Sequence, residues 1–375
     1  MIRAIQILVG ATLVLALAAR AHAYPQFSLS RGQTCIECHL APAGGGLLNE
    51  NGENVAGNLG KWDTTPSFLY GKVPLPTWLS AGGDFRGVVG YMHEPQGASA
   101  LFPMQGDLYG DAIYNRFGDT SVGVHVTAGF RPAQWRNEAA TYFWSREHYL
   151  TLREMFGDDA AYVRVGRFMP VFGLRLAEHE DYTRRYGGTQ LYSETYGASA
   201  SYIAASWELH VSGFIKDPVI DTVEDYHGGA IYSERRFGTR AAVGGEVMFK
   251  QDSLDTYDRY GMTGKYLIES PGILIQTEVQ VARHIVNGVS ATNQIVGYAL
   301  GTWMATDSVM VDVGAGYFNE DAHVKDLYRD AFDVNVHWFV ESHTELVLNT
   351  RLETLAFGSG GPTGAYALLQ AHYRL

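Results

Sequence analysis

Cysteine and charged residues are both scarce in this sequence. It contains only two cysteines, and charged residues make up 18% of the chain. No hydrophobic run beyond residue 23 reaches the ~20 residues that a membrane-spanning helix needs. The formal net charge of −12 argues against nucleic acid or an anionic lipid surface as the main partner.

Tyrosine and glycine, in contrast, are abundant. The chain has 23 Tyr and 43 Gly, and 46% of its residues are hydrophobic. Much tyrosine and glycine with few charges and no later hydrophobic helix indicates a β-rich protein. This composition fits a membrane β-barrel better than a soluble α/β enzyme.

The first residues have the layout of an export signal. A basic head ends at Arg3, residues 4–19 are almost wholly apolar, and Ala21-His22-Ala23 fits the small-x-small cleavage pattern. We therefore expect a signal peptide over residues 1–23 and a mature chain that begins at Tyr24. The alternative is an uncleaved anchor helix, for which the apolar stretch is somewhat short.

Both cysteines lie in one short motif that predicts a covalently attached haem c. Cys35, Cys38 and His39 form C-x-x-C-H, the attachment signature of c-type haem. The two thiols add across the haem vinyl groups, and the adjacent histidine is placed to bind the iron as an axial ligand. Three alternatives compete: a disulfide in an exported protein, a thioredoxin-like pair, and a zinc site. The flanks are loop-like, and residues 24–92 contain no further Cys or His.

The same segment lacks a usual second iron ligand. Residues 24–91 contain no Met and no His other than His39. Because the second axial ligand of cytochrome haems is usually Met or His, the iron is either open on one side or bound by a residue from elsewhere.

Hydrophobic and polar residues alternate along the rest of the chain, as they do in β-strands. Val122, Val124 and Val126 fall on one face of residues 121–130, and His125 and Thr127 fall on the other. Repeating this count predicts about 16 strands of a length suited to a tilted membrane strand. The predicted spans are 78–92, 104–117, 120–131, 144–155, 160–169, 192–205, 207–216, 228–237, 239–250, 256–269, 272–285, 292–304, 307–318, 327–340, 343–355 and 364–375.

The connections between these strands alternate between short and long. Short ones include 118–119, 157–159 and 270–271, and long ones include 93–103, 132–143, 170–191, 217–227 and 356–363. Outer-membrane barrels have short periplasmic turns and longer outer loops. We therefore expect a transmembrane, antiparallel, up-and-down β-barrel, an all-β fold, with its haem segment on the periplasmic side or in the barrel lumen. Aromatic residues near strand ends, such as Trp78, Tyr91, Phe168, Phe318 and Trp338, fit its interface girdles. The alternative is a soluble protein of two β-sandwiches.

Two resemblances follow from these features. The stretch from Cys35 to Asn49 resembles the single-haem head of exported cytochromes from bacteria that move electrons to and from their surface. The remainder resembles porin-type outer-membrane barrels, although the chain ends in Tyr373-Arg374-Leu375 and not in an aromatic residue. The implied domains are a signal peptide (1–23), a c-type haem-binding segment (24–77) and an outer-membrane β-barrel (78–375).

The resemblance implies electron transfer at the periplasmic side of the outer membrane of a Gram-negative bacterium. The expected partners are outer-membrane lipid and periplasmic or multihaem cytochromes, with no nucleic acid and with room for an oligomer. Two other functions stay open: a solute porin with a structural or regulatory haem, and an open-iron haem enzyme such as a peroxidase. No acid–base constellation tied to the motif supports the enzyme.

The longest connection, 170–191, has a second implication. In porin-type barrels the third outer loop often folds into the lumen and narrows it. Fixed charges there set channel selectivity. By this resemblance the pore-constriction candidates are Arg164, Arg175, Arg184 and Arg185. An ordinary surface loop is the alternative.

Three histidines are candidates for the second iron ligand. Closure of a barrel places the last strand beside the first, and His372 lies on the luminal face of the last strand. His337 lies on the luminal face near the end of its strand, and His343 opens the next one. We expect His372 first, on the side of the barrel where the haem segment is attached. The alternative is that all three are ordinary polar lumen residues.

Overall fold

In the computed structural model, a single closed β-sheet makes up most of the described chain. The predicted signal peptide and its cleavage before Tyr24 lie outside the described residues. Those residues are 35–42, 44, 46–57, 68–93, 98–130, 143–157, 159–176, 178, 180–190, 193–218, 226–286, 291–341, 343–354 and 363–375.

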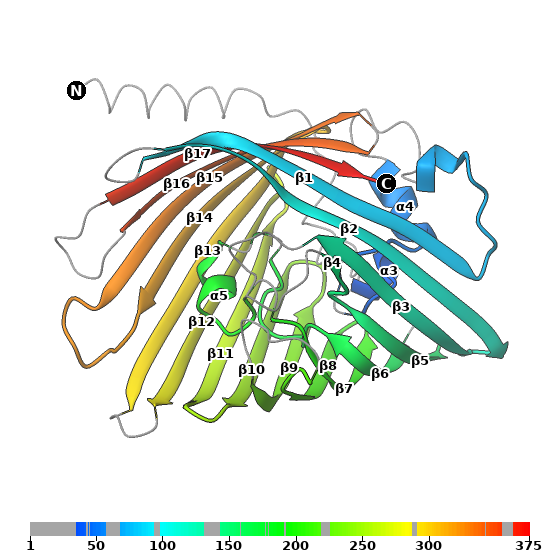
Figure 1. Ribbon diagram of the computed structural model, residues 1–375, viewed down its shortest axis with the longest axis horizontal. Helices are drawn as coiled ribbons and strands as arrows, with labels where there is room; N and C mark the ends of the chain where they lie inside the picture. Colours follow the sequence, from blue (N-terminus) through cyan, green and yellow to red (C-terminus); the bar gives the residue numbers. More distant parts are fainter. Residues whose placement is uncertain are drawn as a thin grey trace.

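Except for β4 and β5, consecutive strands pair antiparallel, and β1 also pairs with β17, which closes the sheet into a barrel (Figure 1). Two short segments, β4 and β5, both pair with β3 and are parts of one strand. The predicted 16-strand, up-and-down antiparallel barrel is therefore confirmed. The strand bounds are β1 (Leu79–His93), β2 (Ala98–Phe117), β3 (Thr120–Phe130), β4 (Phe143–Trp144), β5 (His148–Phe156), β6 (Asp159–Phe168), β7 (Thr195–Ala204), β8 (Trp207–Ile215), β9 (His227–Phe237), β10 (Ala241–Gln251), β11 (Asp255–Ile268), β12 (Ile273–Val286), β13 (Thr292–Thr306), β14 (Val309–Asn319), β15 (Tyr328–Glu341), β16 (Thr344–Thr354) and β17 (Thr363–Arg374).

The strands begin and end within three residues of their predicted spans, except for two. Strand β2 begins at Ala98, within the predicted loop 93–103, and Pro103 pairs with Gly87 beside a shift in register. Proline gives no N–H to a ladder and is tolerated at such irregularities. The predicted strand 144–155 is interrupted between β4 and β5. There the carbonyl oxygen of Arg146 accepts a hydrogen bond from Arg167 Nε, at 3.0 Å, in place of a ladder partner.

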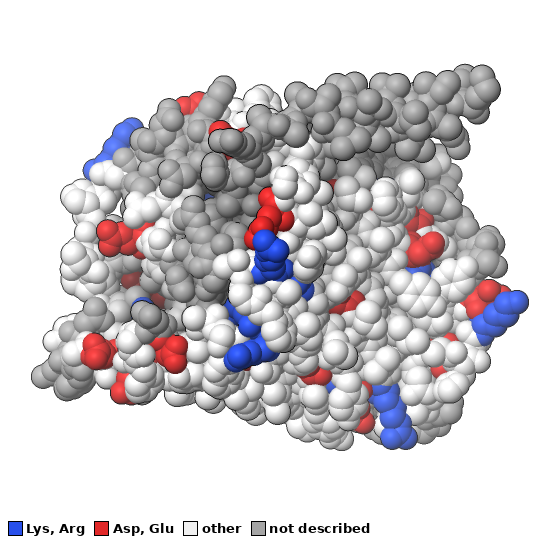
Figure 2. Space-filling model, turned by 180° about the vertical axis from the view of Figure 1, so that it is seen from behind, with Lys and Arg blue, Asp and Glu red and all other residues white. Residues whose placement is uncertain are grey.

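The outside of the barrel is apolar and the inside is polar. Val122, Val124 and Val126 are between 42% and 45% exposed, whereas His125 and Thr127 on the opposite face are 4% and 2% exposed. On the face in Figure 2, charged side chains gather in a few groups, with wide uncharged areas between the groups. An apolar exterior around a polar interior suits a lipid environment and is the reverse of a soluble sandwich. The sandwich alternative is therefore wrong.

The predicted aromatic girdle is only partly present. Trp78, Tyr91 and Trp338 are about half exposed on the outside. Phe168 and Phe318, in contrast, are 1% and 7% exposed and belong to the interior. The ring of Phe318 stacks on Tyr186 at 4.1 Å. Their assignment to the girdle is wrong, because residues of the long connection 169–194 fill the lumen beside them.

The helices of the described residues are short: α3 (Cys35–Cys38), α4 (Glu50–Gly57), the 3-10 helix η1 (Phe68–Gly71) and α5 (Tyr182–Arg185). Figure 1 shows α3, α4 and the C-terminus toward one end of the barrel, and α5 inside it. Within the described part of the chain, no helix has the length and apolar character to cross a membrane.

Candidate haem site and lumen

The C-x-x-C-H motif belongs to a small folded unit. Helix α3 carries both cysteines, and His39 N donates to the carbonyl oxygen of Cys35 at 2.8 Å. Asn49 joins α3 to α4. Its Oδ1 accepts from Gly52 N at 2.9 Å as the N-cap of α4, and its Nδ2 donates to the carbonyl oxygen of Ile36 at 2.9 Å. Such a cap satisfies a helix N–H that would otherwise lack a partner.

Two glycines allow the chain to pack closely around the motif. A Cβ on Gly52 would overlap the carbonyl oxygen of Cys38, so only glycine lets α4 lie directly on α3. Gly44 has a φ of +81°, and a Cβ there would lie 3.5 Å from Cys35 Sγ. Glycine adopts this left-handed backbone without strain. The segment is therefore shaped around the cysteines.

This unit sits in the mouth of the barrel at the end that carries the short turns. Ile36 packs against Ala160 and Ile203, which lie at the short-turn ends of β6 and β7. Across the mouth, Ala56 of α4 packs in a cluster with Met304 and Phe339 of β13 and β15. The motif is therefore held between opposite walls.

A cavity of about 1030 Å³ opens directly beside the motif. This volume is at the upper end of the ~300–1,000 Å³ common for ligand pockets. Luminal residues of the strands and of the long connection form the rest of its lining. Those that matter below are Cys35, Cys38, His39, Asp84, Arg175, Arg184, Lys265, Asp312, His337 and His372.

The residues present fit a covalent haem. Cys35 and Cys38 are thiols and are not joined in a disulfide, so the disulfide alternative is not the state seen here. Among the described residues, no group of three or more His, Cys, Asp or Glu side chains could hold a metal ion, which leaves the zinc alternative without a ligand set there. Two thiols one helical turn apart, with His39 adjacent and all three facing one cavity, are the donors that haem c requires.

The structure brings two of the three candidate second ligands to the cavity wall. His372 Nε2 lies 2.7 Å from Asp84 Oδ1, and its Nδ1 lies 3.1 Å from Glu345 Oε2. His337 Nδ1 lies 2.8 Å from the other oxygen of Glu345, and its Nε2 lies 3.2 Å from Asp312 Oδ2. Both rings are thus held between carboxylates, and iron ligation would require one nitrogen to leave its partner.

The third candidate, His343, has a different position. It is 1% exposed, in the short connection between β15 and β16, and its φ is +68°. Its Nδ1 lies 2.6 Å from the carbonyl oxygen of Arg374 at the end of β17. This contact braces the turn against the last strand.

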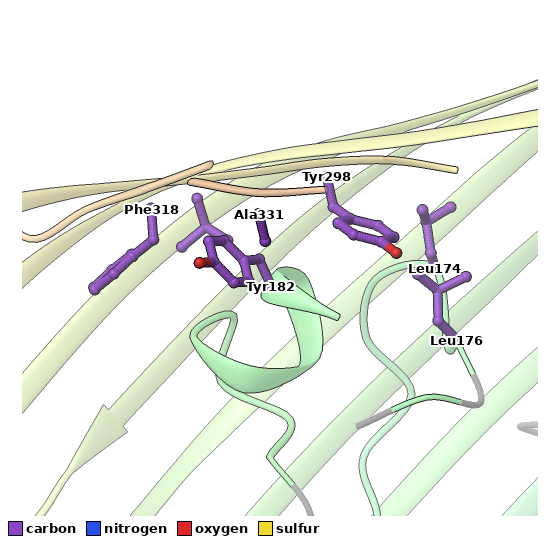
Figure 3. Close-up of a cluster of buried hydrophobic side chains, with 7 residues drawn as sticks. Leu174, Leu176, Tyr182, Tyr298, Phe318 and Ala331 are labelled. Atoms are coloured by element: carbon purple, nitrogen blue, oxygen red, sulfur yellow. The ribbon is translucent and has the colours of Figure 1, made fainter. Parts of the chain in front are cut away.

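The long connection after β6 lies inside the barrel, as the resemblance to porins predicts. Leu174, Leu176 and Tyr182 of this luminal loop pack against Tyr298, Phe318 and Ala331 of the sheet (Figure 3). The N–H of Leu174 also donates to Glu278 Oε2 at 2.8 Å.

Asp181, directly before α5, is 4% exposed within this luminal loop. Burial raises the pKa of Asp181 to about 8. Its carboxyl group is therefore mainly protonated at neutral pH.

The four arginines proposed for a pore constriction have separate roles. Arg164 lines the wall at 1% exposure, with its guanidinium 4.3 Å from the ring of Phe168. Arg184 donates to the carbonyl oxygen of Leu176 at 2.6 Å and so braces the luminal loop. Arg185 is 36% exposed and pairs with Glu180 and Glu353.

Arg175 lines the same cavity as the motif. Its Nη2 donates to Glu208 Oε1 at 2.6 Å, and its guanidinium lies 5.2 Å from the ring centre of Tyr232. Burial alone lowers the pKa of Arg175, but the nearby carboxylates, Glu208 first, outweigh it and hold the pKa above its usual value. Only Arg175 and Arg184 of the four belong to the cavity lining among the described residues.

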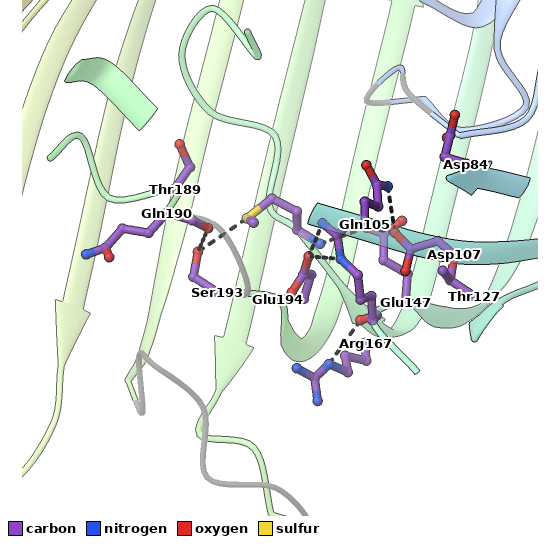
Figure 4. Close-up of polar contacts among 12 residues, drawn as sticks. Asp84, Gln105, Asp107, Thr127, Glu147, Arg167, Thr189, Gln190, Ser193 and Glu194 are labelled. Atoms are coloured by element: carbon purple, nitrogen blue, oxygen red, sulfur yellow. Dashed lines mark hydrogen bonds and ion pairs between the residues drawn. The ribbon is translucent and has the colours of Figure 1, made fainter. Parts of the chain in front are cut away.

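Sequence reasoning missed one luminal contact. Arg146, in the interruption between β4 and β5, lies 3.1 Å from Asp107 and 2.8 Å from Glu194. Figure 4 shows Asp107 and Glu194 on either side of this contact. The only available signal was the break in alternation around Arg146.

Comparison with known proteins supports the fold. No protein-family model matches the chain, and no curated protein matches it in sequence. Among solved structures it is similar to OmpT of Vibrio cholerae in its trimer form, with 14% identity and a TM-score of 0.64 over 79% of this chain and 99% of that one. It is also similar to the anion-selective porin from Comamonas acidovorans (12% identity, TM-score 0.62, 79% and 99% covered). A third similar structure is Salmonella typhi OmpF in complex with daunomycin (9%, 0.63, 79% and 97%). The chain has the 16-strand barrel fold of outer-membrane porins and channels.

Proposed function

We propose that this chain is an outer-membrane barrel that holds one covalent haem c in its periplasmic mouth and takes part in electron transfer. The observation that carries the proposal is the position of Cys35, Cys38 and His39. All three line one cavity at the short-turn end of a barrel with an apolar exterior. Short turns mark the periplasmic end of outer-membrane barrels, which is the side where haem is attached to c-type cytochromes.

The chain's own residues would bind and orient the group. Cys35 and Cys38 would hold it covalently, and His39 would bind its iron from the side of α3. Asn49 and Gly52 fix α3 against α4, and this limits the motion of the motif. Bound there, haem c supplies a single one-electron redox centre.

A redox partner is part of this proposal. One haem cannot bridge the ~25 Å apolar band of an outer-membrane barrel. The barrel would therefore act as a sheath or dock for electron exchange with periplasmic carriers or a multihaem cytochrome.

Electron exchange with a soluble carrier tests this function. Purified protein in detergent is mixed with a reduced, soluble c-type cytochrome, and its haem absorbance is followed in time. We expect the haem to become reduced, and the Cys35→Ser, Cys38→Ser double variant to show no such signal. A covalently loaded protein that exchanges no electrons with any small carrier would contradict the electron-transfer role.

A solute porin with a structural or regulatory haem is the second candidate. The porin-like fold and the large luminal cavity favour it. Conductance in planar bilayers, compared between oxidised and reduced protein, separates the two functions. Ion conductance that responds to the haem state, without electron exchange, would favour the porin.

A further inference from the structure

Arg175 is held in place by an unusual backbone. The luminal loop reverses direction around Leu174, with Gly173 at φ +65° and Arg175 at φ +59°. A Cβ on Gly173 would lie 2.7 Å from Glu278 Oε1, and its positive φ is one that glycine adopts without strain. Arg175, however, carries a side chain in a left-handed conformation that strains non-glycine residues. Such backbone strain persists where the surrounding structure fixes it, and it clusters at functional sites.

The side chain of Arg175 is enclosed on the side of the barrel wall. It is 13% exposed, bonds Glu208 and lies over the ring of Tyr232. Its Nη1 is buried and has no hydrogen-bond partner among the described residues. The same cavity is lined by Cys35, Cys38 and His39. Arg175 therefore lines the cavity of the motif with one hydrogen-bond donor left over.

The charged residues next to Arg175 do not neutralise its positive charge. Glu208 also pairs with Arg236 at 2.5 Å, and Arg236 lies 3.4 Å from Glu234. Glu234 in turn lies 2.8 Å from Lys265. This luminal cluster of three cations and two carboxylates has one excess positive charge, and its members Arg175 and Lys265 line the cavity beside the motif.

We propose that Arg175 is a positioning residue of the haem pocket, which ties the luminal loop to the cofactor and raises its reduction potential. This inference rests on the proposed function. One-electron reduction lowers the positive charge at the iron, with the electron supplied by an external reductant. A fixed guanidinium beside the pocket favours that reduced state.

The size of the effect follows from Coulomb's law. A unit charge about 10 Å away, at an effective dielectric constant of about 20, changes a one-electron equilibrium constant roughly tenfold. A tenfold change corresponds to about 59 mV for a one-electron couple.

Redox titration of the full-length parent protein and four variants in detergent tests this proposal. Arg175→Gln should lower the midpoint potential by an amount near the tenfold estimate, and Arg175→Lys should keep most of the parent value because it keeps the charge. Glu208→Gln should shift the potential in the opposite direction, since it removes a counter-charge, and a merely structural disturbance would not produce opposite shifts. Arg185→Gln, on the same loop but 36% exposed and paired elsewhere, is the matched control and should leave the potential unchanged.

The outcomes separate this inference from the function on which it rests. Haem-loaded Arg175→Gln and Glu208→Gln proteins with the parent potential would overturn the role of Arg175 alone. A parent protein without covalent haem would overturn the proposed function, and this inference with it.

Discussion

Arginine in place of Val124 tests the membrane-facing exterior of the barrel. Val124 is 42% exposed, near the middle of β3, which runs from Thr120 to Phe130. Its register partners are Leu150 on β5, which is 58% exposed, and Ala112 on β2. The arginine would therefore enter an apolar surface far from either end of the strand.

The expected cost follows from this depth. A charged residue at the bilayer midplane of a barrel costs ~2–4 kcal/mol, and one near the interface ~0–1 kcal/mol. Val124→Arg should lower the free energy of unfolding by the larger amount. Thr120→Arg, at the short-turn end of the same strand, should lower it by the smaller one. Val124→Leu keeps the apolar surface and should have little effect.

The assay is urea unfolding of the barrel in lipid vesicles, followed by tryptophan fluorescence. A shift in the midpoint with an unchanged slope reports a change in stability alone. Equal and small effects of Val124→Arg and Thr120→Arg, within about 0.5 kcal/mol, are what a solvent-exposed surface gives. That result would refute the assignment of this face to lipid.

Three further predictions concern the interior. Gly52→Ala should force α4 away from Cys38 and destabilise the contact between α3 and α4 by ~1–3 kcal/mol. The N-terminal segment should then be proteolysed faster, and proteolysis at the parent rate would contradict the tight contact. Burial raises the pKa of Asp181 to about 8 in the folded protein. The stability that protonated Asp181 contributes should therefore be complete below pH ~4 and be lost as the pH rises to ~8. The free energy of unfolding of Asp181→Asn should depend less on pH across this range, and an unchanged dependence would count against the burial of this carboxyl group. His372→Ala should convert a low-spin haem spectrum to high-spin, and an unchanged spectrum would exclude this ligand.

The barrel itself was predictable because its signal is local. Side chains in a strand alternate with a period of two, so Val124 and His125 identify their faces without knowledge of any partner strand. The predicted strand bounds are wrong where contacts with distant residues determine the local backbone conformation. Pro103 sits in a strand because of its pairing with Gly87, and the break at Arg146 goes with a contact to Arg167.

The candidate site was predictable only as far as one motif extends. Cys35, Cys38 and His39 are adjacent in sequence, so their chemistry is visible without a fold. The surroundings of the motif depend on closure of the barrel. His372 meets Asp84, 288 positions away in sequence, only because β17 pairs with β1. The contact between Arg175 and Glu208 depends on how the luminal loop folds back.

The most direct test of this account is a haem stain of outer-membrane fractions after denaturing gel electrophoresis. The account predicts a haem-stained band at the size of the mature chain in these fractions. The band should be absent from the Cys35→Ser, Cys38→Ser double variant, although immunoblotting still detects its barrel there. A parent barrel present in the outer membrane without stainable haem, or a band that survives the double substitution, would contradict the central claim.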